Sequence, residues 1–394
     1  MSDSRGREWQ AVQRWALVVA AVGIAVCAAG AFWQRQAFFA GLLVGWMYWT
    51  GIGVGCLGLL LLNNVTGGAW GAAIRRQLVA GASGMALSAV LFLPLVAGLS
   101  DLYPWARPDV VAHDPMLQHK QPYLNVPFFL ARAAGYFFVW LALLGYVGWR
   151  ERRAARTGAP RDQRGVRLAS AQGLLLYGLT VTFAAVDWGM SLEPHWTSHI
   201  YGVLLMIGQA LSGLAFCTAA LLLLPTRAVE RPLPPASSRQ DLGTLLLAFT
   251  MLWAYMALSQ FLIIWYANIP EEATWYLRRT QGGWQWAAGA LVALHFFLPF
   301  ALLLSRQLKR NPRALAAVAV GLLAMRWVDL VWLIEPAFDR EGTFVPWLDL
   351  AATAAMGGLW IAFFAWRMGR SEGAQASDAT KAVDRRAVST EAAV

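Results

Sequence analysis

Residues 38–62 read FFAGLLVGWMYWTGIGVGCLGLLLL, a run without one charged side chain. A helix of about 20 apolar residues crosses the hydrocarbon core of a bilayer, because each residue adds about 1.5 Å of rise. Inside the bilayer the helix also satisfies its own backbone hydrogen bonds, which an irregular segment of this composition cannot do. The run therefore predicts a transmembrane helix.

Runs of similar length recur along the whole chain, each bounded by charge, proline or glycine. The chain is 58% hydrophobic and 14% charged, more apolar than a water-soluble domain of this length can bury. The first run is too long for a signal-peptide core and lacks a cleavage site, so we expect it to be retained. We predict an all-α membrane protein of ten transmembrane helices. They cover approximately residues 15–34, 38–62, 77–99, 127–149, 168–188, 200–224, 242–267, 284–305, 313–334 and 347–367.

Lysine and arginine divide unevenly between the two sides of this predicted bundle. If successive connections alternate between sides, one side holds 24 of the 32 basic residues, the other holds 6, and 2 lie within spans. Cytoplasmic connections retain the excess of positive charge, so both termini are predicted in the cytoplasm. The chain then divides into a cytoplasmic N-terminus (1–14), a transmembrane domain (15–367) and a polar tail (368–394) that we expect to be disordered. The same distribution explains the net charge of +10 without a nucleic-acid partner.

A short sequence motif recurs at the ends of two predicted spans. Asp187-Trp-Gly-Met-Ser-Leu-Glu193-Pro194 closes the fifth span, and Asp329-Leu-Val-Trp-Leu-Ile-Glu335-Pro336 closes the ninth. Both segments follow the pattern Asp-x5-Glu-Pro, and four spans separate them, so both face the outer surface. A parallel repeat of two four-helix units, approximately 38–188 and 200–334, has this arrangement. We therefore expect Asp187 and Asp329 at equivalent positions in the two units.

A charge within a span is costly and by default indicates a functional site, and five ionisable residues of the predicted spans are the candidates. Arg326 and Asp329 are close enough on one helix face to pair, as a structural ion pair or as a site of proton movement. Arg132 either reaches the outer loops or pairs with Asp187, which we expect near water at the end of its helix. His295 is a proton shuttle or a hydrogen-bonded core histidine. The predicted proton path thus comprises Arg132, Asp187, His295, Arg326 and Asp329.

Residues that could hold a redox cofactor are sparse. A haem b between helices ordinarily takes two histidines, and His295 is the only one within a span, so we expect no haem on this chain. Pro194-His-Trp-x-x-His199 spaces two imidazoles four residues apart, but a third ligand is missing, so we expect no metal and favour contact with a partner protein. The three cysteines, Cys27, Cys56 and Cys217, lie singly in apolar runs, which predicts no disulfide and no iron–sulfur ligation.

A quinol site needs an amphipathic cleft and a carboxylate or histidine that accepts protons as electrons leave. Asp187, Glu193 and His195, near the outer surface, meet this chemical requirement and are the candidate quinol or outer-interface residues. The sequence contains no Gly-rich phosphate loop, Walker motif or nucleophile elbow, so enzymes that act on soluble substrates have little support.

Three outer segments resemble a known family. Residues 187–202 (DWGMSLEPHWTSHIYG) and 259–272 (SQFLIIWYANIPEE) are similar to the F subunit of alternative complex III, a bacterial quinol:cytochrome c oxidoreductase. Residues 119–129, with His119-Lys120 and Tyr123-Leu-Asn125, resemble the outer loop of the same family before its fourth helix. Together with the ten predicted transmembrane helices, the resemblance covers roughly residues 15–367.

The resemblance implies a NrfD-like fold of two four-helix bundles plus two additional helices in the bacterial inner membrane. It also implies partners: a C-type NrfD-like membrane subunit, a periplasmic multihaem cytochrome c and iron–sulfur subunits, which hold the haem c and the clusters. This chain would support quinol oxidation and proton translocation without its own redox cofactor, and quinone binding to it stays open. A membrane anchor of another NrfD-type reductase and a secondary transporter are the alternatives, although the paired, broken helices of a transporter are not evident.

Overall fold

The computed structural model describes residues 2–224, 233–338 and 346–391, with side-chain positions described for residues 8–224, 233–338 and 347–370. The described residues are almost wholly helical and contain no strand. Ten helical segments are long and apolar enough to cross a membrane. The chain is therefore an all-α, multi-pass membrane protein, as its composition predicts.

Each of the ten spans overlaps one predicted run. Several helices extend beyond the predicted apolar runs. The Arg-rich residues between the fourth and fifth spans, for example, belong to the ends of α9 and α10. The spans are Glu8–Trp33 (in α1, Ser2–Trp33), Arg35–Thr66 (α2), Ala69–Val96 (α3, Ala69–Ser83; α4, Met85–Leu91; α5, Leu93–Val96), Val126–Thr157 (α9), Pro160–Leu192 (α10, Pro160–Trp188, and η2, Met190–Leu192), Tyr201–Leu223 (α11), Ala236–Ala267 (α12), Trp284–Leu304 (α14, Trp284–Ala290; η3, Leu291–Phe297; α15, Leu298–Leu304), Pro312–Ala337 (α17, Pro312–Ile334, and η4, Glu335–Ala337) and Trp347–Arg370 (in α18, Pro346–Glu391).

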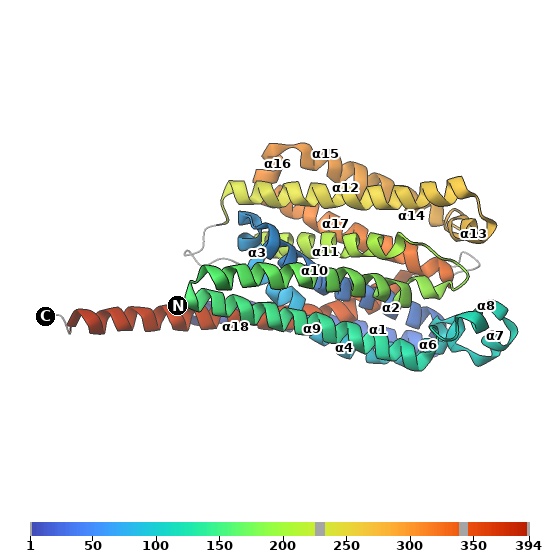
Figure 1. The fold of residues 1–394 in the computed structure, drawn as a ribbon, viewed down its shortest axis with the longest axis horizontal. Coiled ribbons are helices and arrows are strands. Elements are labelled where there is room, and N and C mark those ends of the chain that lie inside the picture. Colours follow the sequence, from blue (N-terminus) through green and yellow to red (C-terminus); the bar gives the residue numbers. More distant parts are fainter. Residues whose placement is uncertain (1, 225–232, 339–345, 392–394) are drawn as a thin grey trace.

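Both termini lie at one end of the bundle, and the short helices α7 (Pro108–His113), α8 (Pro115–Lys120) and α13 (Pro270–Arg279) lie at the other (Figure 1). We call the first the basic end, after the basic connections that it contains, and the second the outer end, after the surface that the sequence analysis predicts it to face. Helix α18 continues to Glu391, into the segment 368–394 for which disorder stays a prediction. The segment after residue 370 is rich in alanine and lacks proline, which allows a helix to continue.

Helices α2 and α11 pack against each other at the centre of the bundle. Glycine makes their approach close: a Cβ atom at Gly55 would lie 1.9 Å from the carbonyl oxygen of Gln209, and one at Gly213 would lie 2.8 Å from the backbone nitrogen of Cys56. Small residues let transmembrane helices bring their backbones together in this way, which gains van der Waals contact in the absence of a hydrophobic driving force.

The other helices surround this central pair. Helix α2 contacts α3 and α10, and α11 contacts α12 and α17; α10 and α17 each contact both central helices. The fourth span, α9, contacts α10, and the eighth span contacts α12 and α17. The first and last spans, α1 and α18, pack against each other and, through α18, against α2. The fifth and ninth spans therefore occupy corresponding places around the central pair.

The outer connections are ordered where they are described. Residues 97–125 form α6 (Leu99–Leu102), the 3₁₀ turn η1 (Pro104–Ala106), α7 and α8, and residues 270–279 form α13. Their aromatic rings pack on one another; Trp196 and Trp275, for example, stack with ring centroids 4.6 Å apart. These loops thus act as a cap over the helices. The predicted outer connection at 336–346 lies largely outside the described residues.

Candidate functional site

The ninth span carries a buried ion pair. Arg326 and Asp329, one helical turn apart on α17, form a hydrogen-bonded salt bridge, and their residues are 1% and 2% exposed. The indole Nε1 of Trp253 on α12 donates to Asp329 Oδ2 at 3.3 Å. Glycine at position 208 of α11 makes room for the guanidinium, since a Cβ there would lie 2.3 Å from Arg326 Nη2. The predicted pair is therefore present, and three helices enclose it.

His295 lies beside this pair, on the eighth span. The residue is completely buried, and its ring meets Trp253 edge-on with centroids 4.3 Å apart. Both ring nitrogens lack a hydrogen-bond partner among the described residues. The surrounding backbone, η3, is a π-helix within the span. Such π-segments in α-helices are frequent at functional sites.

Arg132 and Asp187 form the second intramembrane ion pair, between the fourth and fifth spans. Arg132 Nε and Nη2 donate to the two carboxylate oxygens of Asp187 at 2.8 Å each, and Tyr136 Oη donates to Oδ2 at 2.7 Å. Arg132 Nη1 also donates to the carbonyl of Tyr123 in the outer loop, so both predicted contacts of this arginine are made. The α9 helix that positions Arg132 begins at a side-chain cap from Asn125.

The two aspartates of the repeated Asp-x5-Glu-Pro motif, Asp187 and Asp329, differ in their surroundings. The expectation that water reaches Asp187 is wrong: its residue is fully buried, because Arg132 and Tyr136 cover the carboxylate. Asp187 pairs with an arginine from a neighbouring helix, whereas Asp329 pairs within its own helix. The two spans occupy corresponding places, but the aspartates do not have equivalent partners.

Glu193 is the centre of a network that sequence reasoning missed. Its carboxylate accepts from Arg279 Nη2 at 2.9 Å and from Arg278 Nη1 at 2.8 Å. Arg279 is completely buried, stacks over Trp275 at 3.6 Å and donates to the carbonyls of Trp332 and Leu333 at the end of α17. Burial lowers the pKa of Arg279, and the neighbouring Glu193 opposes that shift. One signal was available: two adjacent arginines on the side that is poor in basic residues.

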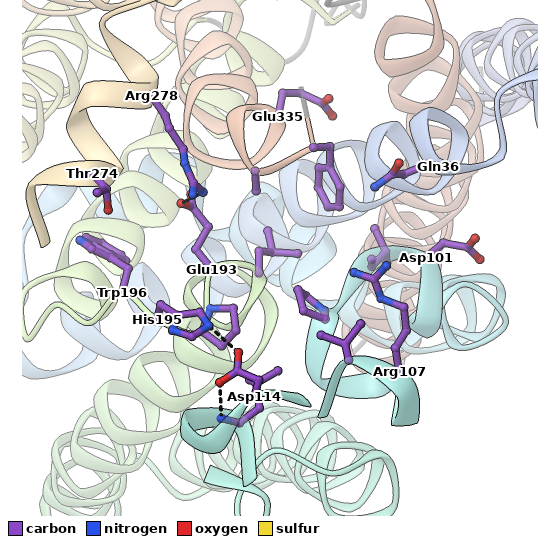
Figure 2. A pocket seen from close by; sticks show the side chains of 18 of the residues that line it. Gln36, Asp101, Arg107, Asp114, Glu193, His195, Trp196, Thr274, Arg278 and Glu335 are labelled. Atoms are coloured by element: carbon purple, nitrogen blue, oxygen red, sulfur yellow. Dashed lines mark hydrogen bonds and ion pairs between the residues drawn. The ribbon is translucent and has the colours of Figure 1, made fainter. Parts of the chain in front are cut away.

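His195 lies in the outer loops, three residues after the end of the fifth span. Its Nε2 is 2.7 Å from Asp114 Oδ2, and the other oxygen of Asp114 accepts from the backbone N–H groups of Met116 and Leu117. Desolvation opposes ionisation of Asp114, but the backbone and His195 hydrogen bonds outweigh it and lower the pKa of this carboxyl. Figure 2 shows His195 facing Asp114, with Glu193 and Arg278 on the adjoining wall.

These side chains line an outer cavity of about 920 Å³. Glu193 and His195 both face it, so two of the three candidate quinol residues share one space, whereas Asp187 is not among the residues that line it. Further charged side chains surround the cavity between the outer ends of the helices, namely Asp101, Arg107, Asp114, Glu271, Arg278, Glu335 and Asp349. The cavity is therefore polar and accessible from the outer end of the bundle.

Two of the three cysteines, which lie in separate apolar runs of the sequence, meet in the fold. Cys56 on α2 and Cys217 on α11 are both fully buried, and their sulfur atoms lie 3.6 Å apart at the central helix crossing. They are 161 positions apart in the chain, so spacing rules could not pair them. Cys27, on α1, is buried elsewhere. Cys56 and Cys217 are thus free thiols in contact.

No protein-family model matches this sequence, and no curated protein matches it either. The assignment of function therefore depends on the residues and their geometry.

Proposed function

We propose that this chain is an F-type membrane subunit of a quinol:cytochrome c oxidoreductase of the alternative complex III class. In this proposal it supports quinol oxidation and carries protons, and it holds no redox cofactor of its own. It resides in the bacterial inner membrane with its basic end in the cytoplasm, and its ten helices form two NrfD-like bundles plus two additional helices. The observation that carries the proposal is the buried group of Arg326, Asp329 and His295 at membrane depth, together with the outer segments 187–202 and 259–272.

The packing of the helices supports the two-bundle part of the proposal. Helix α2 contacts α3 and α10 of the first unit, α11 contacts α12 and α17 of the second, and the fifth and ninth spans each contact both central helices. Two related four-helix units give this arrangement, with α1 and α18 as the additional pair. The excess of lysine and arginine at the basic end supports its cytoplasmic placement.

The chemistry of the buried group supports proton transfer. Asp329 is a carboxylate that a proton can neutralise, and Arg326 stabilises its ionised form. His295 offers two unpaired ring nitrogens next to Trp253, which itself donates to Asp329. Buried polar atoms without protein partners are sites where internal water binds. Water between His295 and Asp329 would connect two proton carriers within one unit.

The outer end supports the predicted partners. Its cavity presents both signs of charge together with His195, His113 and His119 in the adjoining loops. Aromatic packing holds these loops in place, so they offer a preformed surface. In the proposal this surface meets the periplasmic multihaem cytochrome c and iron–sulfur subunits, which carry haem c and the clusters, beside a C-type membrane subunit. A quinol head group at Glu193 and His195 would have a carboxylate and an imidazole as proton acceptors.

The test is an Asp329→Asn variant in the complex purified from its native host. We expect haem c and iron–sulfur subunits to co-purify, and we expect quinol:cytochrome c turnover with proton release to fall at least about tenfold, as for loss of a proton-transfer group. Asp241→Asn, at an exposed position near the start of α12 and at the opposite end from the proposed partners, is the matched control and should leave both rates unchanged.

Three results would count against the proposal. Normal turnover and proton release in an assembled Asp329→Asn complex would reject the proton role. Co-purification with a different class of reductase would favour the anchor alternative. Purification of the wild-type chain alone, with substrate uptake into vesicles, would favour a transporter.

A further inference from the structure

The basic end of the second unit carries a concentrated group of cations. Helix α16 (Arg306–Arg310) forms the short connection between α15 and α17, and it lies beside the start of α12. Arg306 Nε and Arg310 Nε both donate to Oε1 of Gln240, at 3.1 and 3.0 Å. Because two donors share one oxygen, these two nitrogens lie within about 6 Å of each other. One neutral amide thus holds two like charges together.

A third and a fourth cation complete the group. Arg239 Nε donates to the carbonyl of Arg310 at 2.9 Å, which joins the start of α12 to α16. Lys309 is only 9% exposed, and its ammonium donates to the hydroxyl of Thr244 at 3.2 Å. Glycine at position 243 admits its stem, since a Cβ there would lie 2.6 Å from Lys309 Cγ. The lysine is therefore built into the packing rather than extended into water.

None of these four cations has a carboxylate within salt-bridge distance in the part of the chain that the structure describes. Like charges this close repel, and a buried ammonium is costly without a counter-charge. The general excess of basic residues on the cytoplasmic side accounts for their number. This excess does not account for their convergence on Gln240 and Thr244. Basic residues scattered over the cytoplasmic connections would satisfy the preference for positive charge on that side equally well.

The surroundings indicate which anion would complete the site. Leu302 and Leu304, at the end of the eighth span, are 36% and 59% exposed directly before α16. The cations thus lie at the border between an apolar lipid-facing helix and water. Basic pockets between transmembrane helices at this depth bind the phosphate groups of anionic lipids, whose acyl chains then lie along the helix.

We propose that Arg239, Arg306, Lys309 and Arg310 form a binding site for the phosphate group of an anionic phospholipid, with an acyl chain along α15. The site is independent of the proposed respiratory function, since it lies at the opposite end of the bundle from the outer cavity. Its occupant would join α12 and α16 at the basic end.

The experiment measures phosphatidylglycerol binding to the full chain in detergent, by native mass spectrometry and by the shift in unfolding temperature. Arg306→Gln/Arg310→Gln should bind roughly thirtyfold more weakly, as expected for the loss of two cations near an anionic lipid. Arg161→Gln/Arg164→Gln is the matched control, because it removes the same charge from two exposed positions at the start of α10. The control should bind as the wild type does, and phosphatidylcholine should bind weakly to all three proteins.

Equal loss of binding in the two double variants would overturn the proposal in favour of diffuse charge attraction. Stabilisation by inorganic phosphate equal to that by the lipid would also overturn it, in favour of a soluble-anion site. If Arg306→Gln/Arg310→Gln does not give monodisperse protein, Arg306→Lys/Arg310→Lys replaces it. That variant keeps the charge but loses the Nε donors to Gln240; binding below wild type is expected, and wild-type binding would contradict a built site.

Discussion

Arg132 on α9 and Asp187 on α10 form a two-pronged ion pair in which each carboxylate oxygen accepts a guanidinium hydrogen bond of 2.8 Å. The pair connects the fourth span to the fifth, and Arg132 also holds the outer loop through the carbonyl of Tyr123. Planar, paired hydrogen bonds of this kind are stronger and more directional than single contacts. The contacts of Arg132 therefore hold α9, α10 and the outer loop together.

Breaking this pair should be strongly destabilising. Asp187→Asn removes the negative charge and leaves the Arg132 guanidinium buried without its counter-charge, for which we expect a cost of about 3–5 kcal/mol. The measurement is the unfolding temperature of the full chain in detergent. Arg132→Lys keeps the positive charge but loses the paired geometry, and its cost should be smaller. An Asp187→Asn protein that unfolds like the wild type would show that the pair does not fix these helices.

The adjacent arginines at the outer end offer a matched comparison. Arg279→Met removes a buried side chain that contacts Glu193 and two carbonyls of α17, so we expect a loss of about 2–5 kcal/mol. Arg278→Met removes a contact to the same carboxylate, but the Arg278 side chain is 52% exposed, and such pairs contribute about 0–1 kcal/mol. Unfolding temperatures of the two variants give the test. Equal losses of stability in the two variants would mean that the burial of an arginine does not determine how much it stabilises the fold.

His295 should be dispensable for folding if its role is proton transfer. Its ring nitrogens have no partner in the described structure, so His295→Leu removes unpaired polar atoms and should be neutral or stabilising. Asp329→Leu, in contrast, leaves Arg326 without its counter-charge and should destabilise by about 3–5 kcal/mol. Thermal unfolding of both variants distinguishes the cases. A clear loss of stability in His295→Leu would assign that residue a structural role.

The two central cysteines should be open to oxidation into a disulfide. Cys56 and Cys217 have their sulfur atoms 3.6 Å apart, and a side-chain rotation that brings them to about 2.05 Å completes the bond. Membrane-permeant diamide, which takes up the two electrons and two protons, is the oxidant. Mass spectrometry of the digested, unreduced protein should find the 56–217 cross-link and leave Cys27 unlinked. Cross-links that involve Cys27 at equal yield would indicate that proximity in the fold does not govern the reaction.

The local features of this protein followed from the sequence. Hydrophobic run length gives all ten spans, because each helix must itself be apolar enough to lie in lipid. The Arg326–Asp329 pair was also predictable, since residues three apart share one helix face. Even the contact of Arg132 with Asp187 was among the alternatives, because a buried charge requires a partner nearby.

The long-range features required the tertiary structure. Glu193 meets Arg279, 86 positions away, and Cys56 meets Cys217 across the central crossing; neither pairing leaves a periodic signal in the chain. The packing also decided that Asp187 is sealed from water and that Asp187 and Asp329 have different partners despite their shared motif. Composition determines which segments enter the membrane. The arrangement of the helices determines which polar groups meet inside it, because that depends on faces brought together from distant parts of the chain.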